Sequence, residues 1–347
     1  MLSYQALTAI FGKTGPLRIL HRPDSWSSAR ARLTAQPERR VGVVCGLLLS
    51  LLMSDETSPR GAPGNKRIDI HDPDEVRHGS RGSPSTDVPR QEPQKSYHTI
   101  LEQHVRQAQE ELERPAVALL LSGLSAGLDL GFGPFLMAVM TTLTAGELPH
   151  SVSQILIALA YSAGFIFVVM GRSELFTEQT TSAVLPVLSR RANLRQLLRL
   201  WALVLVANLV GATVIAAIIA QVGPRMGAIE ISALGEIAAR LLSHPWWIML
   251  LSAIAAGWLM GLLAWLVIAS RDTVSQIIVV MLTTFVIGIA GFHHSIAGTT
   301  EVLMGVFASA GPTVADFAPF LLWSVLGNAV GGAVFVAVLK FGHVHAS

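Results

Sequence analysis

The chain has 347 residues, of which 51% are hydrophobic and 14% charged, and its mean hydropathy is +0.53. This composition is too apolar for a soluble globular chain of that length and predicts a membrane protein. The formal net charge of +2 gives no reason to expect a nucleic-acid partner, and the lone Cys45 excludes an intramolecular disulfide.

The first 96 residues are polar, apart from one apolar run, VGVVCGLLLSLL, at 41–52. This run falls short of the roughly 20 residues that span a bilayer. It is either a signal-like region or, as we favour, the end of an over-extended gene start covering 1–52, because Met53 begins a sequence typical of a cytosolic N-terminus. The Ser-, Pro- and Gly-rich remainder predicts that 1–96 is a disordered tail.

Residues 97–115 predict an amphipathic lead-in helix, because apolar residues recur at helical spacing opposite Glu and Arg. Such a helix lies on the membrane surface, packs against a partner subunit, or simply leads into the first span. The residues of the expected inner face are Ile100, Leu101, His104, Val105, Ala108 and Leu112.

Residues 116–341 predict a domain of six membrane segments, followed by a short tail at 342–347. The second and fifth segments are too long for simple spans and carry polar interruptions, GRSELFTEQTTS at 171–182 and GFHHSIAGTT at 291–300. Lipid cannot hydrogen-bond a loosened backbone, so these breaks must be buried in protein or line a polar cavity. The six segments are about 116–142, 151–188, 195–221, 245–270, 274–308 and 314–341.

Loop charges indicate the orientation of these segments. Arginines follow the second segment at 190, 191, 195 and 199, and Arg271 follows the fourth. Basic loops stay in the cytoplasm, so both termini are expected there. Arg225 and Arg240 fall on the outer side and count against this orientation.

The two halves of the domain match each other in three places. LLSGLSAGLDLG at 120–131 matches LLSAIAAGWLMG at 250–261, NLVGATV at 208–214 matches NAVGGAV at 328–334, and each broken segment carries a Thr-Thr pair. Three spans repeated once must insert in opposite orientations, which is the inverted 3+3 repeat of transporters and channels. Chance identity among small apolar residues is the alternative, and agreement of three blocks in one order argues against it.

The motifs GRSELFTEQTTSAVLPVL, NLVGA, GFHHSIAG and GNAVGGA resemble those of the formate/nitrite transporter family, over roughly 122–341. The lead-in ERPAVALLLSGLSAGL is similar to the YfdC-like branch of bacterial inner-membrane members. The resemblance implies an aquaporin-like fold with broken second and fifth helices, a homopentamer in the inner membrane, and one narrow pore in each protomer.

The resemblance also implies roles for single residues. His294 corresponds to the family's central pore histidine, and Thr177 faces the same pore. Where the family usually has Glu before that histidine, this chain has His293, which either lines the pore or packs against a neighbouring helix. The implied constrictions are formed by Phe165, Leu175 and Phe176 on the cytoplasmic side and by Tyr161 and Ile287 on the outer side.

An imidazole suits the passage of a weak acid, because it donates a hydrogen bond in either protonation state and titrates near neutral pH. The sequence therefore favours a channel or facilitator for small monovalent weak-acid anions, with His294 supplying hydrogen-bond or proton assistance. The alternatives are a pore for a small neutral solute and a non-conducting scaffold or sensor. No cofactor, metal site or enzymatic activity is expected, since the His-His pair lacks further ligands at useful spacing.

Overall fold

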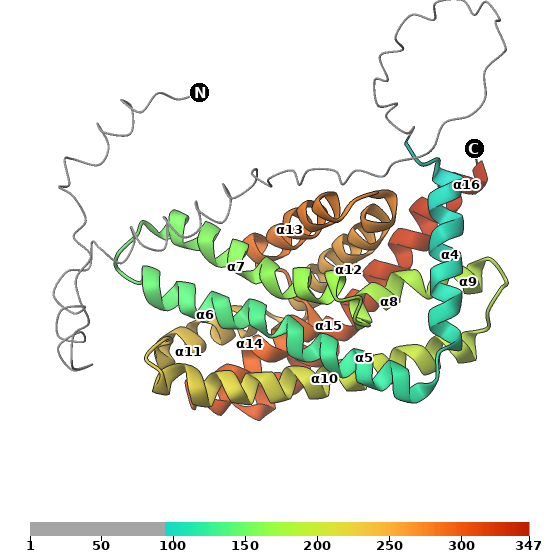
Figure 1. Cartoon of the computed structure of the whole chain (residues 1–347). Coiled ribbons are helices and arrows are strands. Elements are labelled where there is room, and N and C mark those ends of the chain that lie inside the picture. Colours follow the sequence, from blue (N-terminus) through green and yellow to red (C-terminus); the bar gives the residue numbers. More distant parts are fainter. Residues whose placement is uncertain (1–93, 347) are drawn as a thin grey trace, which may run out of the picture. The chain divides into compact units, whose positions relative to one another are not determined.

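The computed structural model describes residues 94–346, whose regular elements are all helices (Figure 1). The expected gene start at 1–52, and all but the last three residues of the expected disordered tail, lie outside the described residues.

Six helical stretches are long and apolar enough to cross a membrane. All six expected spans begin within two residues of the predicted position, and the prediction of an all-α membrane protein with six spans is confirmed. The stretches are α5 (Ala116–Leu130) with α6 (Phe132–Thr144), α7 (His150–Met170), α10 (Leu194–Arg225), α12 (Trp246–Ala269), α13 (Thr273–Ala290), and α15 (Val314–Val334) with η1 (Phe335–Phe341) and α16 (Gly342–Ala346).

Five shorter helices complete the described part of the chain: α4 (Tyr97–Glu113), α8 (Phe176–Ser182), α9 (Val184–Leu188), α11 (Ile231–Leu242) and α14 (Ser295–Phe307). The first is the amphipathic lead-in, and its buried residues are those of the expected inner face. By contrast, α11 was not expected as a helix. It occupies the same place before α12 that α4 occupies before α5.

Local signals explain where the two broken segments stop. The helix α13 ends at Gly291, whose φ of 66° is left-handed, and the N–H of Phe292 returns to the carbonyl of Ile287. Glycine is the residue that adopts this conformation without strain. After α7, the turn at Gly171 places Arg172 at a φ of 53°. The chain therefore leaves the helical path at both breaks and re-enters it at α8 and α14.

The helices pack in pairs that repeat between the two halves. In the first half α5 packs against α10, and in the second half α12 packs against α15. Glycines permit this close approach: a Cβ on Gly127 would lie 2.3 Å from the carbonyl oxygen of Asn208, and one on Gly331 would lie 2.1 Å from that of Ile254. The short helices cross over, since α8 packs against α12 and α15 whereas α14 packs against α10.

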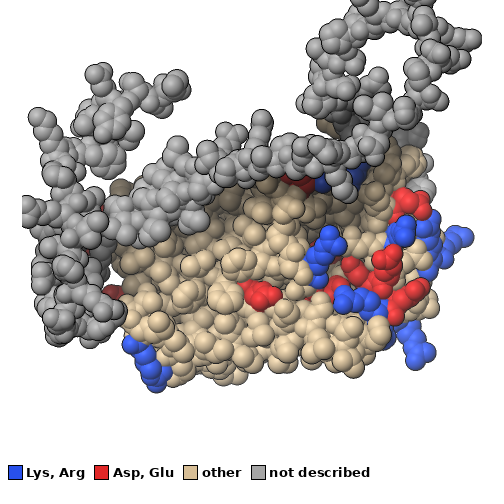
Figure 2. Space-filling view, viewed as in Figure 1, with Lys and Arg blue, Asp and Glu red and all other residues tan. Residues whose placement is uncertain are grey.

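Charged side chains gather at one end of the helical domain. Figure 2 shows most of the charges on this face at the end that carries α4, beside a broad uncharged surface. The same end holds α9 and α16, which contact α4 and its neighbours, and Figure 1 places α11 at the opposite end. We refer to these as the α4 end and the α11 end.

Candidate pore site

The first break, between α7 and α8, is held by buried side chains that bond to its backbone. The N–H of Glu174 donates to Ser122 Oγ at 3.0 Å. Asn208 Nδ2 donates to the carbonyls of Gly123 and Glu174, at 2.8 and 2.9 Å. Asn208 Oδ1 accepts the N–H of Phe176 at 2.8 Å. The polar groups freed by the break are thus paired within the protein.

The second break, between α13 and α14, is held by the same set of bonds. The N–H of His293 donates to Ser252 Oγ at 3.0 Å. Asn328 Nδ2 donates to the carbonyls of Ala253 and His293, at 2.8 and 3.0 Å, and its Oδ1 accepts the N–H of Ser295 at 2.8 Å. Each bond has its counterpart at the first break. This correspondence supports the internal repeat read from the sequence.

The two short helices meet at Thr177 and His294. Thr177 lies in the first turn of α8, and His294 is the N-cap of α14. Thr177 Oγ1 and His294 Nε2 are 2.9 Å apart. Because His294 Nδ1 accepts the N–H of Ala297 at 3.2 Å, the proton of the neutral ring is on Nε2. His294 therefore donates to Thr177, whose own hydroxyl proton is free to be donated to a ligand.

This pair is closed off from water by apolar side chains. Thr177 is 0% exposed and His294 is 1% exposed. The ring of Phe165 stands edge-on to the imidazole, with centroids 5.0 Å apart, and Tyr161 packs against Phe165 at 5.0 Å. The other expected constriction residues are also buried, with Phe176 packed against Trp201; these are Leu175, Phe176 and Ile287.

The ring of His293 is fully engaged by the neighbouring helices. Its Nε2 donates to the carbonyl of Leu241 at 2.9 Å, and its Nδ1 accepts from Ser252 Oγ at 2.8 Å. His244 lies edge-on to it, with centroids 5.7 Å apart. Both nitrogens are therefore used to join the second break to α11 and α12, and neither is left for a ligand.

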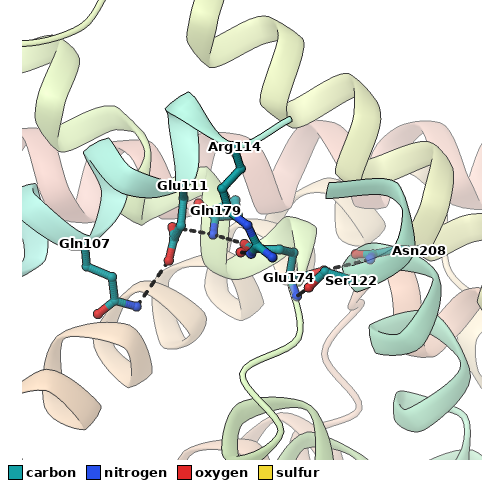
Figure 3. Close-up of polar contacts among 7 residues, drawn as sticks. All are labelled: Gln107, Glu111, Arg114, Ser122, Glu174, Gln179 and Asn208. Carbon is teal, nitrogen blue, oxygen red and sulfur yellow. Dashed lines mark hydrogen bonds and ion pairs between the residues drawn. The ribbon is translucent and has the colours of Figure 1, made fainter. Parts of the chain in front are cut away.

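At the first break, the position equivalent to His293 holds Glu174, which belongs to a charged network (Figure 3). Glu174 Oε1 accepts from Arg114 Nη1 at 2.6 Å, and Glu174 Oε2 accepts from Gln179 Nε2 at 2.5 Å. The same amide nitrogen donates to Glu111 Oε2 at 2.7 Å. This network joins α4 to the break and to α8.

Sequence reasoning did not assign a role to Ser122, Ser252, Asn208 or Asn328. A signal was present, because all four lie in the repeated blocks and match in register. Glu111 and Gln179 carried no such signal, since their pairing depends on how α4 folds back onto α8. Within residues 94–346, no three His, Cys, Asp or Glu side chains gather where they could hold a metal ion.

A six-span helical protein in which two short helices meet end to end at a buried polar pair has the architecture of a membrane channel or transporter. The family model described as formate/nitrite transporter matches residues 98–342. The chain belongs to the formate/nitrite transporter family, and members of this family are transporters and channels rather than enzymes.

Known relatives agree with this assignment and with the resemblance to the YfdC-like branch. The inner membrane protein YfdC of Escherichia coli K12 is 33% identical over 247 residues, which cover 70% of this chain and 78% of that protein. A probable formate transporter of Methanothermobacter thermautotrophicus is 29% identical, covering 65% of this chain and 88% of its own.

Two solved structures share the fold. A pentameric formate channel with formate bound superposes with a TM-score of 0.56 at 26% identity, covering 67% of this chain and 98% of its own. An ion channel of the same family superposes with a TM-score of 0.61 at 22% identity, covering 72% of this chain and 98% of its own.

Proposed function

We propose that this chain forms a membrane pore for small monovalent weak acids of the formate and nitrite kind, assembled from five copies. The relatives named for formate and nitrite, and the pentameric channel of similar fold, support this proposal. The observation that carries it is the contact between Thr177 and His294, which joins the two short helices inside the protein.

This site is suited to a weak acid rather than to a permanently charged ion. An isolated charge in an apolar passage costs several kcal/mol or more, whereas a monoacid can cross as the neutral form. The N-termini of α8 and α14 both face the contact, and each adds partial positive charge. With the free hydroxyl of Thr177, they would stabilise the carboxylate or nitrite oxygens as the proton is exchanged.

His294 acts in this proposal as a neutral donor. A proton on Nδ1 would remove the acceptor for the N–H of Ala297, so an imidazolium would break the cap of α14. Phe165, Leu175 and Phe176 narrow the path on the α4 side, and Tyr161 and Ile287 narrow it on the α11 side. His293 is a positioning residue, because it fixes the backbone directly before His294.

The α4 end faces the cytoplasm in this proposal. Arg190 and Arg191 lie in the connection between α9 and α10, Arg195 and Arg199 lie in the first turns of α10, and Arg271 lies between α12 and α13, all at that end. Lys95 lies with them, since its Nζ donates to the carbonyl of Ile268 at the end of α12. By the positive-inside rule, this concentration of basic residues supports a cytoplasmic location for both described ends of the chain.

Uptake by the purified chain in liposomes tests the proposal. Formate, nitrite, acetate and a neutral solute such as urea are compared with and without an inward proton gradient. We expect formate or nitrite uptake that the gradient stimulates. His294→Ala should reduce it by roughly 100-fold, the usual effect of removing one preorganised donor. Thr177→Val, which keeps the cap of α14, should reduce it as well.

His150→Ala is the matched control, because this histidine is exposed at the start of α7. Its uptake should equal that of the parent. Uptake of urea without gradient dependence would instead show a pore for neutral solutes, and no uptake of any solute would indicate a scaffold or sensor. Parent-like uptake by both His294→Ala and Thr177→Val would refute the assigned site.

A further inference from the structure

A cavity of about 830 Å³ opens at the α4 end, beside the first break. Its wall reaches Glu174, which directly precedes Leu175 and Phe176, so the cavity adjoins the expected constriction. The charged residues that line it come from α4 and the residues flanking it, from the first break and from α8; they are Lys95, Arg106, Glu110, Glu111, Arg114, Arg172, Glu174 and Glu178.

Two carboxyl groups of this cavity share one amide (Figure 3). Gln179 Nε2 has two hydrogens, and it donates to Glu111 Oε2 at 2.7 Å and to Glu174 Oε2 at 2.5 Å. The other oxygens are also occupied: Glu111 Oε1 accepts from Gln107 at 3.2 Å, and Glu174 Oε1 accepts from Arg114 at 2.6 Å. Two carboxyl groups that accept hydrogen bonds from one nitrogen atom must lie close together.

The network holds one positive charge for two potential negative charges. Arg114 is the cation in contact with Glu174, and Glu178 of α8 adds a third acid nearby. Two carboxylates in one partly buried site do not both ionise at neutral pH. Burial, followed by the charge of Glu174, raises the pKa of Glu111 to about 7, against the opposing effects of Gln179, Gln107 and Arg114.

Among residues 94–346, no other cation contacts the two carboxyl groups directly. Arg106 pairs with Glu110 at 3.4 Å on the exposed side of α4, and Arg199 of α10 donates to the carbonyl of Arg114. Lys95 is bonded to Gln103 and Ile268. Arg172 lines the cavity, and the α12–α13 side contributes the neutral Ser270 and Gln276.

We infer that Glu111 and Glu174, which the Gln179 amide holds together, carry one proton between them. A weak-acid anion in the cavity takes up this proton before it enters the pore. The inference rests on the proposed function. The pair supplies a transferable proton. His294 does not supply one, because the cap of α14 holds it as a neutral hydrogen-bond donor.

In this step the O–H bond of the shared carboxyl breaks and an O–H bond forms on the anion. The pair is left with two carboxylates, which Arg114 partly compensates, and it regains its proton from cytoplasmic water. For export the anion arrives, takes the proton and enters as the neutral acid. For import the neutral acid returns its proton to the pair and leaves as the anion.

Glu111→Gln tests the inference in the full chain. The new amide can still accept from Gln179, and the Gln107 amide can turn to accept from it, so the packing is retained while the titrating carboxyl is lost. Glu113→Gln is the matched control, because Glu113 is two residues later on the same helix, is exposed, and does not line the cavity.

Infrared difference spectra recorded during a pH titration provide the first readout. The parent and Glu113→Gln should show the carbonyl stretch of a protonated carboxylic acid that disappears as pH rises through about 7. The amplitude of this transition should be smaller in Glu111→Gln by one carboxyl group. A parent without the transition, or a Glu111→Gln variant with the parent's amplitude, would overturn the shared proton.

Weak-acid flux one pH unit below and one above that transition provides the second readout. The parent and Glu113→Gln should transport faster below it, and Glu111→Gln should lose about 100-fold at the lower pH, a typical contribution of a positioned proton donor. Equal pH profiles in all three proteins would refute the proton transfer and leave the proposed function intact. A titrating carboxyl without weak-acid flux in the parent would refute the transfer together with the proposed function.

Discussion

A histidine that caps a helix is restricted to one tautomer, and His294 shows the consequence. Its Nδ1 is committed to the N–H of Ala297, so Nε2 must carry the proton that reaches Thr177. Its neighbour His293 has the same tautomer, but both of its nitrogens bond to the neighbouring helices. The two adjacent histidines thus have different roles, determined by the atoms that each ring contacts.

Asn208 and Asn328 have equivalent roles at the two breaks, which yields a prediction about stability. Asn208→Ala leaves the N–H of Phe176 and the carbonyl of Glu174 without this partner inside the protein. Each such group costs about 1–3 kcal/mol, so the free energy of unfolding should fall by roughly 3 kcal/mol or more. Asn328→Ala should have a similar effect, measured as the shift in thermal unfolding in detergent.

The control is Asn193→Ala, which removes the exposed cap of α10 and should cost about 1 kcal/mol. If the two buried variants lose no more stability than this control, the asparagines do not hold the breaks.

At the scale of the elements, α4 is attached to α8 through polar contacts of its buried side chains. Besides the Glu111 network, α4 places the buried His104 against α8, with Nε2 2.8 Å from Ser182 Oγ. The second nitrogen, Nδ1, has no partner within the described residues. Burial lowers the pKa of His104 from 6.5 to about 4, so the ring is neutral when α4 is docked.

This pKa shift predicts that the attachment of α4 weakens in acid. A released His104 takes up a proton below about pH 6.5, whereas the docked ring does so only near pH 4. Docking of the neutral His104 ring therefore contributes its full stability above pH 6.5. This contribution, roughly 3 kcal/mol in total, is lost as pH falls towards 4. The thermal midpoint of the parent should fall between about pH 7 and about pH 5.

His104→Gln is the comparison, because an amide can still bond to Ser182 and does not titrate. Its midpoint should fall less over the same interval. Equal falls in the parent and the variant would show that other groups cause the acid sensitivity.

For the whole molecule, one chain covers only part of its own membrane-spanning surface. Between 22% and 44% of each span's most apolar window is buried within the chain, with α13 at the lower limit. The rest must contact lipid or other copies, since exposed apolar surface of this extent is not stable in water. Association into a ring is consistent with this surface and with the pentameric relative.

The expected assembly is five copies in a mild detergent that retains lipid. Light scattering with detergent correction, or native mass spectrometry, should give a mass five times that of the 37.1 kDa chain. A harsher detergent should release single chains, which serves as the control for mass calibration. A single copy in every lipid-retaining detergent would exclude the proposed pentamer.

The sequence by itself determined the class, the number of spans, the location of both breaks and the family, because hydropathy, glycine turns and the long motifs are local features. It did not predict α11, which lies between the third and fourth expected segments. Only the tertiary structure decided which nitrogen of His294 carries the proton, that both nitrogens of His293 are occupied, and that Glu111 and Glu174 meet on one amide. The first of these facts depends on where α14 begins, because His294 caps it, and the other two depend on contacts between residues far apart in the chain. Hydropathy and motifs specify neither, because a side chain's protonation follows from the atoms that it contacts.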